Sequence, residues 1–147
     1  MKHEEFLSAL DQQRIERAIG DAEKRTSGEI RVHVQPKVLG AEMRTIAEKT
    51  FERLGMTKTA QRNGVLLFIA SEDRRFVILG DKGIDDKVPA GFWDDVLAKL
   101  TTRFKGGEFT DGIVEAVTTT GEHLARYFPP KEGDVDELSN AIDASDD

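Results

Sequence analysis

Apolar residues recur along the first part of the chain at the spacing of an amphipathic helix. The pattern predicts a helix over residues 9–24, and its apolar stripe consists of Ile15, Ala18, Ile19 and Ala22. Ser8 and Asp11 have the spacing of a capping box, so we expect the helix to begin at this pair.

Three segments have the pattern of strands. Residues 30–34 alternate between apolar and polar side chains, which is typical of a strand with one buried face. Residues 65–70 form a continuous apolar run, which predicts a central strand covered on both faces. We therefore expect Phe68, inside that run, to be buried. Residues 76–79 predict a third strand after a polar turn.

Three more helices are predicted around and after these strands. One spans residues 43–54 and is followed by Gly55, a typical C-terminal residue. The next begins near Pro89, and its apolar face includes Phe92 and Trp93, which we interpret as core residues. The last begins at Thr110 and ends before two prolines, residues 129–130.

The order of these elements predicts the topology. A strand, a helix and a second strand form a right-handed crossover, so the first two strands should be parallel. The short polar turn before the third strand predicts an antiparallel hairpin. The fold class is therefore α/β, with helices on the faces of a mixed, mostly parallel sheet that includes one antiparallel hairpin.

Charge divides the chain of 147 residues into two parts. Its net charge is −7, and residues 131–147 contribute seven acidic residues and one basic residue to it. We expect a domain over residues 1–130 and a solvated, mobile acidic tail over residues 131–147, with Leu138 and Ile142 as its only contacts to the domain. A basic face is lacking, so nucleic acid is not an expected partner.

Composition excludes further classes of protein. The chain has no cysteine, so it has no disulfide framework, thiolate metal site or cysteine nucleophile. Its longest apolar run, residues 65–70, is far shorter than the roughly 20 residues that cross a bilayer. The acidic N-terminus lacks the apolar stretch of a signal peptide. We therefore expect a cytoplasmic protein without membrane insertion.

The predicted topology brings three polar segments to one edge of the sheet: the starts of the two parallel strands and the end of the third strand. Their oxygen-bearing side chains are Glu29, Asn63, Asp81, Asp85 and Asp86. Oxygen donors without cysteine or paired histidine favour Ca²⁺ or Mg²⁺. The alternative is structural: Arg62 would pair with Glu29 or Asp81, and no metal would bind.

Other catalytic patterns are missing from the sequence. It has no G-x-S-x-G elbow, no P-loop and no G-x-G-x-x-G. The segment 81–86 also departs from the EF-hand pattern, since its third residue is Gly83. His3, His33 and His123 lie far apart in sequence, and we interpret each as a surface histidine.

Five short segments, in order along the chain, resemble the TPM-domain family, which includes thylakoid-lumen proteins of photosystem repair and many bacterial proteins. The segments are TSGEIRV (26–32), RNGVL (62–66), GDKGI (80–84), GFW (91–93) and FKGGEFTDGI (104–113). Residues 133–138 also resemble the closing segment of small stand-alone bacterial members. The resemblance covers roughly residues 5–130. It implies a three-layer α/β/α sandwich, divalent-metal binding, usually of Ca²⁺, and weak acid phosphatase activity in some members.

These observations lead to three hypotheses. In the first, the protein is a binding or accessory module that holds Ca²⁺ or Mg²⁺ through Asp81, with Glu29, Asp85, Asp86 and the Asn63 carbonyl nearby, and it serves an unidentified protein partner. In the second, it is a metal-assisted phosphatase: the ion polarises a phosphoryl oxygen and Arg62 clamps the phosphate. In the third, it is a metal-free interaction domain whose carboxylates are paired.

Overall fold

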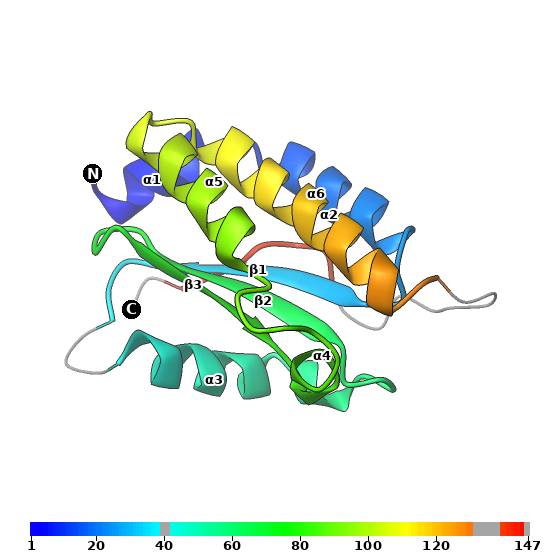
Figure 1. Cartoon of the computed structure of the whole chain (residues 1–147). Coiled ribbons are helices and arrows are strands. Elements are labelled where there is room, and N and C mark those ends of the chain that lie inside the picture. The colour runs from blue at the N-terminus through cyan, green and yellow to red at the C-terminus, as the bar shows by residue number, and fades with distance from the viewer. Residues whose placement is uncertain (39–41, 131–138, 146–147) are drawn as a thin grey trace.

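The protein is a three-layer α/β/α sandwich built on a four-stranded sheet with the order β3-β2-β1-β4. The computed structural model describes residues 1–38, 42–130 and 139–145 (Figure 1). The strands are β1 (Glu29–Gln35), β2 (Gly64–Ala70), β3 (Arg75–Gly80) and β4 (Asp143–Ala144). The sheet is mixed, because β1 is parallel to both β2 and β4, whereas β3 is antiparallel to β2. The predicted fold class is confirmed.

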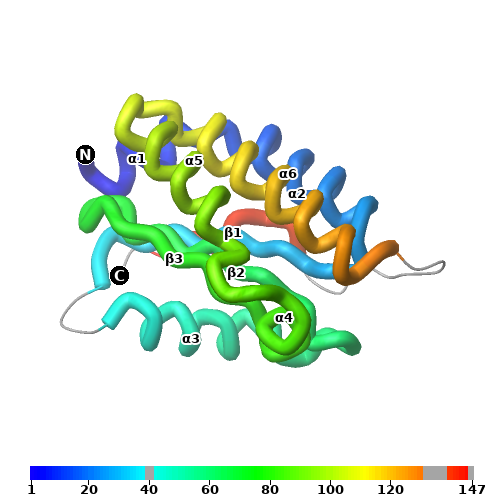
Figure 2. The backbone as a smooth tube through the Cα atoms, in the orientation of Figure 1, coloured from blue at the N-terminus to red at the C-terminus, as the bar shows by residue number. Residues whose placement is uncertain are grey.

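The helices lie on both faces of the sheet, and the three layers can be followed in Figure 2. One face is covered by α1 (His3–Ala9), α2 (Gln12–Glu23), α5 (Asp94–Lys105) and α6 (Phe109–Tyr127). The other face is covered by α3 (Met43–Arg53), with the 3₁₀ turn Met56–Lys58 after it, and the short α4 (Lys82–Asp85) follows β3 at the edge of the sheet. Within the described ranges, no helix is both long and apolar enough to cross a membrane.

The central strand β2 separates two hydrophobic clusters. Val65, Leu67 and Ile69 pack into the cluster beneath α1, α2, α5 and α6. Leu66, Phe68 and Ala70 pack into the cluster beneath α3. Because successive side chains of a strand point to opposite faces, a strand between two helical layers must be apolar at every position. The predicted burial of Phe68 is confirmed, since its exposed fraction is 0%.

The first helix is interrupted where the sequence predicted continuity. α1 ends at Ala9, Leu10 is extended, and α2 begins after Asp11, whose carboxylate accepts a hydrogen bond of 3.1 Å from the Arg14 amide. The expectation that Ser8 caps a single helix is therefore wrong. Two contacts explain the break: Leu10 is buried in the core, and the Asp11 amide donates to Thr110 Oγ1 at 3.1 Å.

The helix α3 matches its predicted limits to within one residue, and Gly55 after it has a φ of 73°. The helix α5 starts at Asp94, after a turn that follows Pro89, and both Phe92 and Trp93 are only half-buried. No prediction covered α4, whose four residues are too few to establish an apolar period.

The C-terminal segment returns to the sheet instead of remaining separate from it. β4 pairs with β1, and the Ser145 amide donates to the Val34 carbonyl at 3.0 Å. Ile142 packs against the core, as the sequence allowed. Within the predicted tail, residues 142–145 are thus attached to the domain by strand pairing and packing. Residues 131–138, which include the expected contact residue Leu138, and residues 146–147 lie outside the described residues, so the tail as a whole stays a prediction. The added strand covers an edge of β1 that would otherwise expose unpaired backbone groups.

Asp143 of β4 is held by two basic side chains. Its Oδ2 lies 2.6 Å from Nδ1 of His33 and 2.8 Å from a guanidinium nitrogen of Arg53. The other His33 nitrogen lies 2.8 Å from Gln35 Oε1, and the Gln35 amide nitrogen donates to the Lys37 carbonyl. Both ring nitrogens of His33 are therefore within hydrogen-bonding distance of a side-chain oxygen.

The interpretation of the histidines as surface residues is wrong for two of them. His33 is 1% exposed, and His3 is also buried, with its Nδ1 2.9 Å from Ser71 Oγ. His123 is half-buried and lies 2.8 Å from Asp95. The local sequence could not predict the partners Ser71, Asp143 and Asp95 of these histidines, because each partner is 28 to 110 residues away.

Asp143→Asn should lower the free energy of unfolding by about 2 kcal/mol at neutral pH, because hydrogen bonds to charged groups contribute about that much. Burial acts to raise the pKa of Asp143. The hydrogen bonds from Arg53 and His33 lower that pKa by more than burial raises it, so the resulting pKa is below the ordinary value of 3.8. The stabilisation is therefore complete above the ordinary value and is lost as the pH falls through the lowered pKa. Guanidinium unfolding at a series of pH values measures it.

The matched control is Asp21→Asn on the exposed surface of α2, which should change stability by less than about 0.5 kcal/mol. Equal stability of Asp143→Asn and wild type at neutral pH would show that β4 does not depend on this carboxylate.

Candidate functional site

Three segments that are remote in sequence meet at the edge of the sheet where β1 and β2 begin and β3 ends. The Glu29 amide donates to the Asn63 carbonyl at 3.3 Å, and the Asp81 amide donates to the Gly64 carbonyl at 2.9 Å. The Gly83 amide reaches the Arg62 carbonyl at 2.8 Å. The predicted convergence of these segments is confirmed.

The dominant interaction at this edge is a two-point ion pair between Arg62 and Asp81. Nε of Arg62 lies 2.7 Å from Oδ2 of Asp81, and one terminal nitrogen lies 2.8 Å from Oδ1. The Asp81 side chain is only 6% exposed, whereas the Arg62 side chain is 45% exposed. The hydrogen bond and the charge of Asp81 raise the pKa of Arg62. The arrangement is the structural alternative that the sequence left open.

Asp81 has a second role, as the N-cap of α4. Its Oδ1 accepts a hydrogen bond of 2.8 Å from the Lys82 amide. Together with the backbone bond to Gly64, this contact fixes the carboxylate in place. Arg62 is held in an unusual conformation, with a φ of 51°. The rigid partner of the ion pair is therefore Asp81, and the partner with a solvent-exposed side chain is Arg62.

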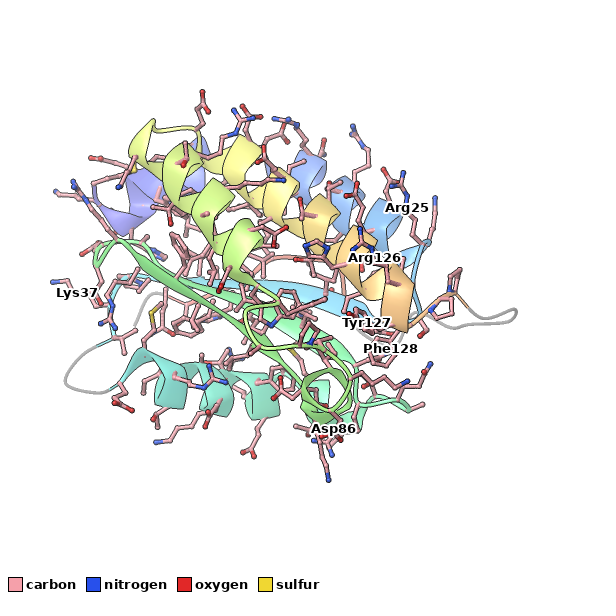
Figure 3. The ribbon with its side chains drawn as sticks, viewed as in Figure 1. Arg25, Lys37, Asp86, Arg126, Tyr127 and Phe128 are labelled. Atoms are coloured by element: carbon pink, nitrogen blue, oxygen red, sulfur yellow. The ribbon has the colours of Figure 1, made fainter. Side chains whose placement is uncertain are left out.

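The other predicted ligands are close to this edge but do not surround one point. Glu29 and Asn63 are buried, and Asn63 Nδ2 donates to Ser27 Oγ at 3.2 Å. Asp85 and Asp86 are exposed, and Asp86 lies at the periphery of the molecule beside α4 (Figure 3).

The side chains as they stand do not form a metal centre. Within residues 1–38, 42–130 and 139–145, no three His, Asp or Glu side chains form a group that could hold a metal ion. The oxygen donors are of the type that Ca²⁺ takes, but the best-placed carboxylate, Asp81, is bound to a guanidinium. A cation fits here only in exchange for Arg62.

The turn before β1 supplies two residues that the sequence analysis passed over. Thr26 Oγ1 donates to the Phe128 carbonyl and accepts a hydrogen bond of 3.1 Å from the Gly28 amide. The Ser27 amide donates to the same Phe128 carbonyl at 2.9 Å. The end of α6 is thereby attached to the edge, next to Asn63. Only the turn-forming T-S-G triplet signalled this link.

The family model of the TPM domain matches residues 1–123. The chain belongs to the TPM-domain family. No curated protein matches it.

Solved structures agree with this assignment. The NMR structure of BA42 from the psychrophilic bacterium Bizionia argentinensis is 44% identical, has a TM-score of 0.86, and the alignment covers 91% of this chain and 92% of that one. N-terminal domains from P. gingivalis (18% identity, TM-score 0.61, covering 82% and 76%) and of cg2496 from Corynebacterium glutamicum (14%, 0.59, 84% and 74%) share the fold.

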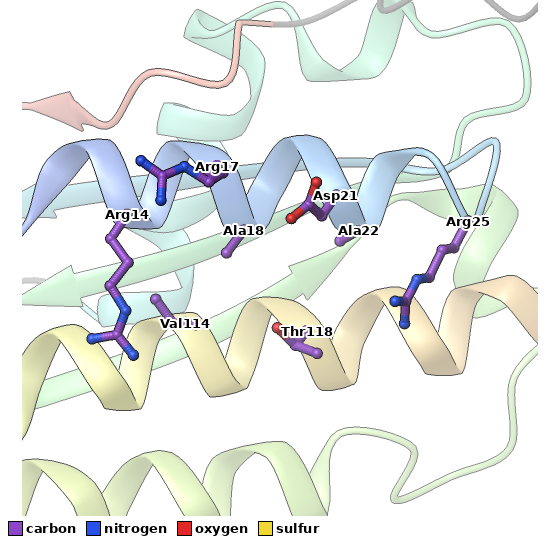
Figure 4. A pocket seen from close by; sticks show the side chains of 8 residues that line it. All are labelled: Arg14, Arg17, Ala18, Asp21, Ala22, Arg25, Val114 and Thr118. Atoms are coloured by element: carbon purple, nitrogen blue, oxygen red, sulfur yellow. The ribbon is translucent and has the colours of Figure 1, made fainter.

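The outer helical face of this TPM domain carries a shallow groove of about 260 Å³ between α2 and α6. Figure 4 shows Arg14 of α2 and Arg25, in the turn after α2, reaching towards α6, and Arg17 pointing away from it. Arg14 is bound to Asp111 at 2.6 Å. The groove is lined by small side chains such as Ala18 and Ala22, and Arg14 is already paired with Asp111. It is therefore a weaker candidate for a binding site than the sheet edge at Asp81.

Proposed function

We propose that this TPM domain is a binding module that takes up a divalent cation, Ca²⁺ or Mg²⁺, at Asp81, and that it serves an accessory role towards a protein partner. One observation carries the proposal: a buried carboxylate, fixed by backbone contacts, already binds a cationic group in the form of the Arg62 guanidinium. The position therefore favours positive charge.

The exchange requires movement of one side chain. Arg62 is nearly half exposed, so its guanidinium can leave for solvent, whereas Asp81 stays fixed as the cap of α4. The nearest further oxygen donors in sequence and topology are Glu29 at the start of β1, Asn63 just before β2, and Asp85 and Asp86 at the end of α4. A bound ion would neutralise these carboxylates in place of the arginine.

Arg62→Gln tests the exchange, because it removes the competing guanidinium while keeping a polar side chain. In calorimetric titrations with CaCl₂ and MgCl₂, we expect Arg62→Gln to bind the ion about tenfold more tightly than wild type. Asp81→Asn should bind at least tenfold more weakly. At a hundredfold excess of ion over Kd, the free energy of unfolding should rise by roughly 2.7 kcal/mol.

The control is Asp73→Asn, in the turn at the opposite end of the sheet, where the carboxylate accepts a hydrogen bond from the Val38 amide. It should leave cation affinity unchanged. If neither wild type nor Arg62→Gln binds either ion, the metal-free interaction domain is the better description. If Asp73→Asn abolishes binding, the site has been placed at the wrong end.

The metal-free alternative is supported by the same ion pair, because Arg62 and Asp81 satisfy one another without an ion. The phosphatase alternative uses Arg62 as a phosphate clamp, and a phosphate would either use the guanidinium donors that Asp81 does not bind or displace Asp81 from the two that it does. An aryl phosphate assay with and without metal separates these alternatives: turnover that needs both the metal and Arg62 would favour the phosphatase.

A further inference from the structure

A cavity of about 530 Å³ lies at the opposite end of the sheet from Asp81, where β2 turns into β3 beneath α1 and the α5–α6 connection. Its volume is within the range of small-molecule sites, about 300–1,000 Å³. The residues used in the argument are of two kinds: the aromatic residues Phe6, Phe76, Phe104 and Phe109, and the basic residues Arg74, Arg75 and Lys105.

The aromatic residues make a continuous apolar wall. The Phe104 ring contacts those of Phe6, Phe76 and Phe109, with centroids 6.0, 5.6 and 5.3 Å apart. Phe6 is buried, whereas the other three are half-buried although the core lies directly behind them. All four rings line the cavity, which can therefore accept an apolar molecule.

The basic residues stand unopposed at this cavity. Arg74, Arg75 and Lys105 are exposed, and in the described part of the chain none of them has an ion pair or hydrogen bond through its side chain. No acidic residue lines the cavity among the described residues. This positive rim occurs on a protein whose net charge is −7.

The acidic residues nearest in sequence are engaged elsewhere. Glu72 accepts a hydrogen bond of 2.8 Å from the His3 amide, and Asp73 accepts one of 2.8 Å from the Val38 amide. Glu108, next to Gly107, is bound to Arg103 at 2.7 Å. The charge of the rim is thus not compensated by its own loops.

We propose that this cavity binds an amphiphilic carboxylate, a molecule with one unbranched apolar chain and a single carboxylate. The chain would lie among the phenyl rings, and the carboxylate would be held by Arg74 and Lys105, which supply positive charge and N–H donors at the rim. A polyanion would leave the aromatic wall unused, and a neutral apolar molecule would leave the cations unused. The site is independent of the cation site proposed at Asp81.

Titration of the ¹⁵N-labelled protein with sodium decanoate, below its micelle concentration, tests the proposal. We expect saturable amide shifts in residues 69–76 and 104–109. Decanol, which lacks the charge, and butyrate, which lacks the chain, should each bind at least tenfold more weakly. Shifts that do not saturate, or equal binding of decanol and decanoate, would overturn the proposal.

Arg74→Gln combined with Lys105→Gln should weaken decanoate binding about tenfold and leave decanol binding unchanged. The matched control removes two exposed arginines away from this cavity, Arg17→Gln on α2 with Arg25→Gln in the turn after it, and should bind decanoate like wild type. A control variant that loses as much affinity would show a general charge effect. If the protein binds phosphatidylglycerol vesicles but not monomeric decanoate, the basic residues recognise a membrane surface and not a single molecule in the cavity. That result would overturn the proposal.

Discussion

Phe68→Ala should lower the free energy of unfolding by about 3–5 kcal/mol, because it removes a fully buried phenyl group and leaves a cavity. The side chain lies in the middle of β2, between strands that are paired with it on both sides. On the α3 face it packs with Leu66 and Ala70 in one cluster, and its ring centroid is 5.0 Å from that of His33. The surrounding strands leave little room for collapse.

Denaturant unfolding measures the loss. Phe68→Leu is the graded control, since it keeps most of the apolar volume, and it should cost less than about 1.5 kcal/mol. A loss below about 1 kcal/mol for Phe68→Ala would mean that β2 is not the central strand of the sheet.

The sheet could be predicted because its determinants are local. The apolar run of β2 and the alternation in β1 set the strands, and the single helix between them requires the parallel pairing. The limits of α3 followed from an apolar stripe and Gly55. In each case the relevant residues are neighbours in sequence, so a periodic pattern records the structure.

The elements that were missed depend on contacts across long separations. The break at Leu10 is stabilised by Thr110, 99 residues after Asp11. The strand β4 has only two residues, and its key side chain, Asp143, meets His33 across 110 positions. Acidic composition in this segment suggested a solvated tail, and composition cannot reveal that one carboxylate has a buried histidine as its partner.

The candidate site divides in the same way. Strand directions predict that Arg62, Asn63 and Asp81 come together, and they do. Which carboxylate binds Arg62 depends on side-chain position, which α4 decides by making Asp81 its N-cap. The cavity beside Arg74 could not be predicted for another reason. Phe76 and Phe104 have the sequence spacing of core residues, although both are only half-buried.

Gly83→Ala should be a severe substitution at this edge. A Cβ atom on Gly83 would lie 2.3 Å from the Gln61 carbonyl oxygen and 2.6 Å from that of Arg62. Both obstacles are backbone atoms, and the Gly83 amide is itself bonded to the Arg62 carbonyl, so α4 and the turn before β2 must separate. We expect a loss of about 3 kcal/mol in the free energy of unfolding, at the upper end for overpacking.

The same variant tests whether the edge depends on the contact between α4 and the Arg62 turn. Because Asp81 begins α4, displacing the helix should weaken its pairing with Arg62 and shift the amide signals of both residues. The control is Gly106→Ala, where the nearest atom to a new Cβ is a carbonyl oxygen at 3.6 Å, and its stability should change by less than about 0.5 kcal/mol. If Gly83→Ala were tolerated as well as Gly106→Ala, the close approach of α4 to residues 61–62 would be wrong, and the placement of Asp81 would have to be revised with it.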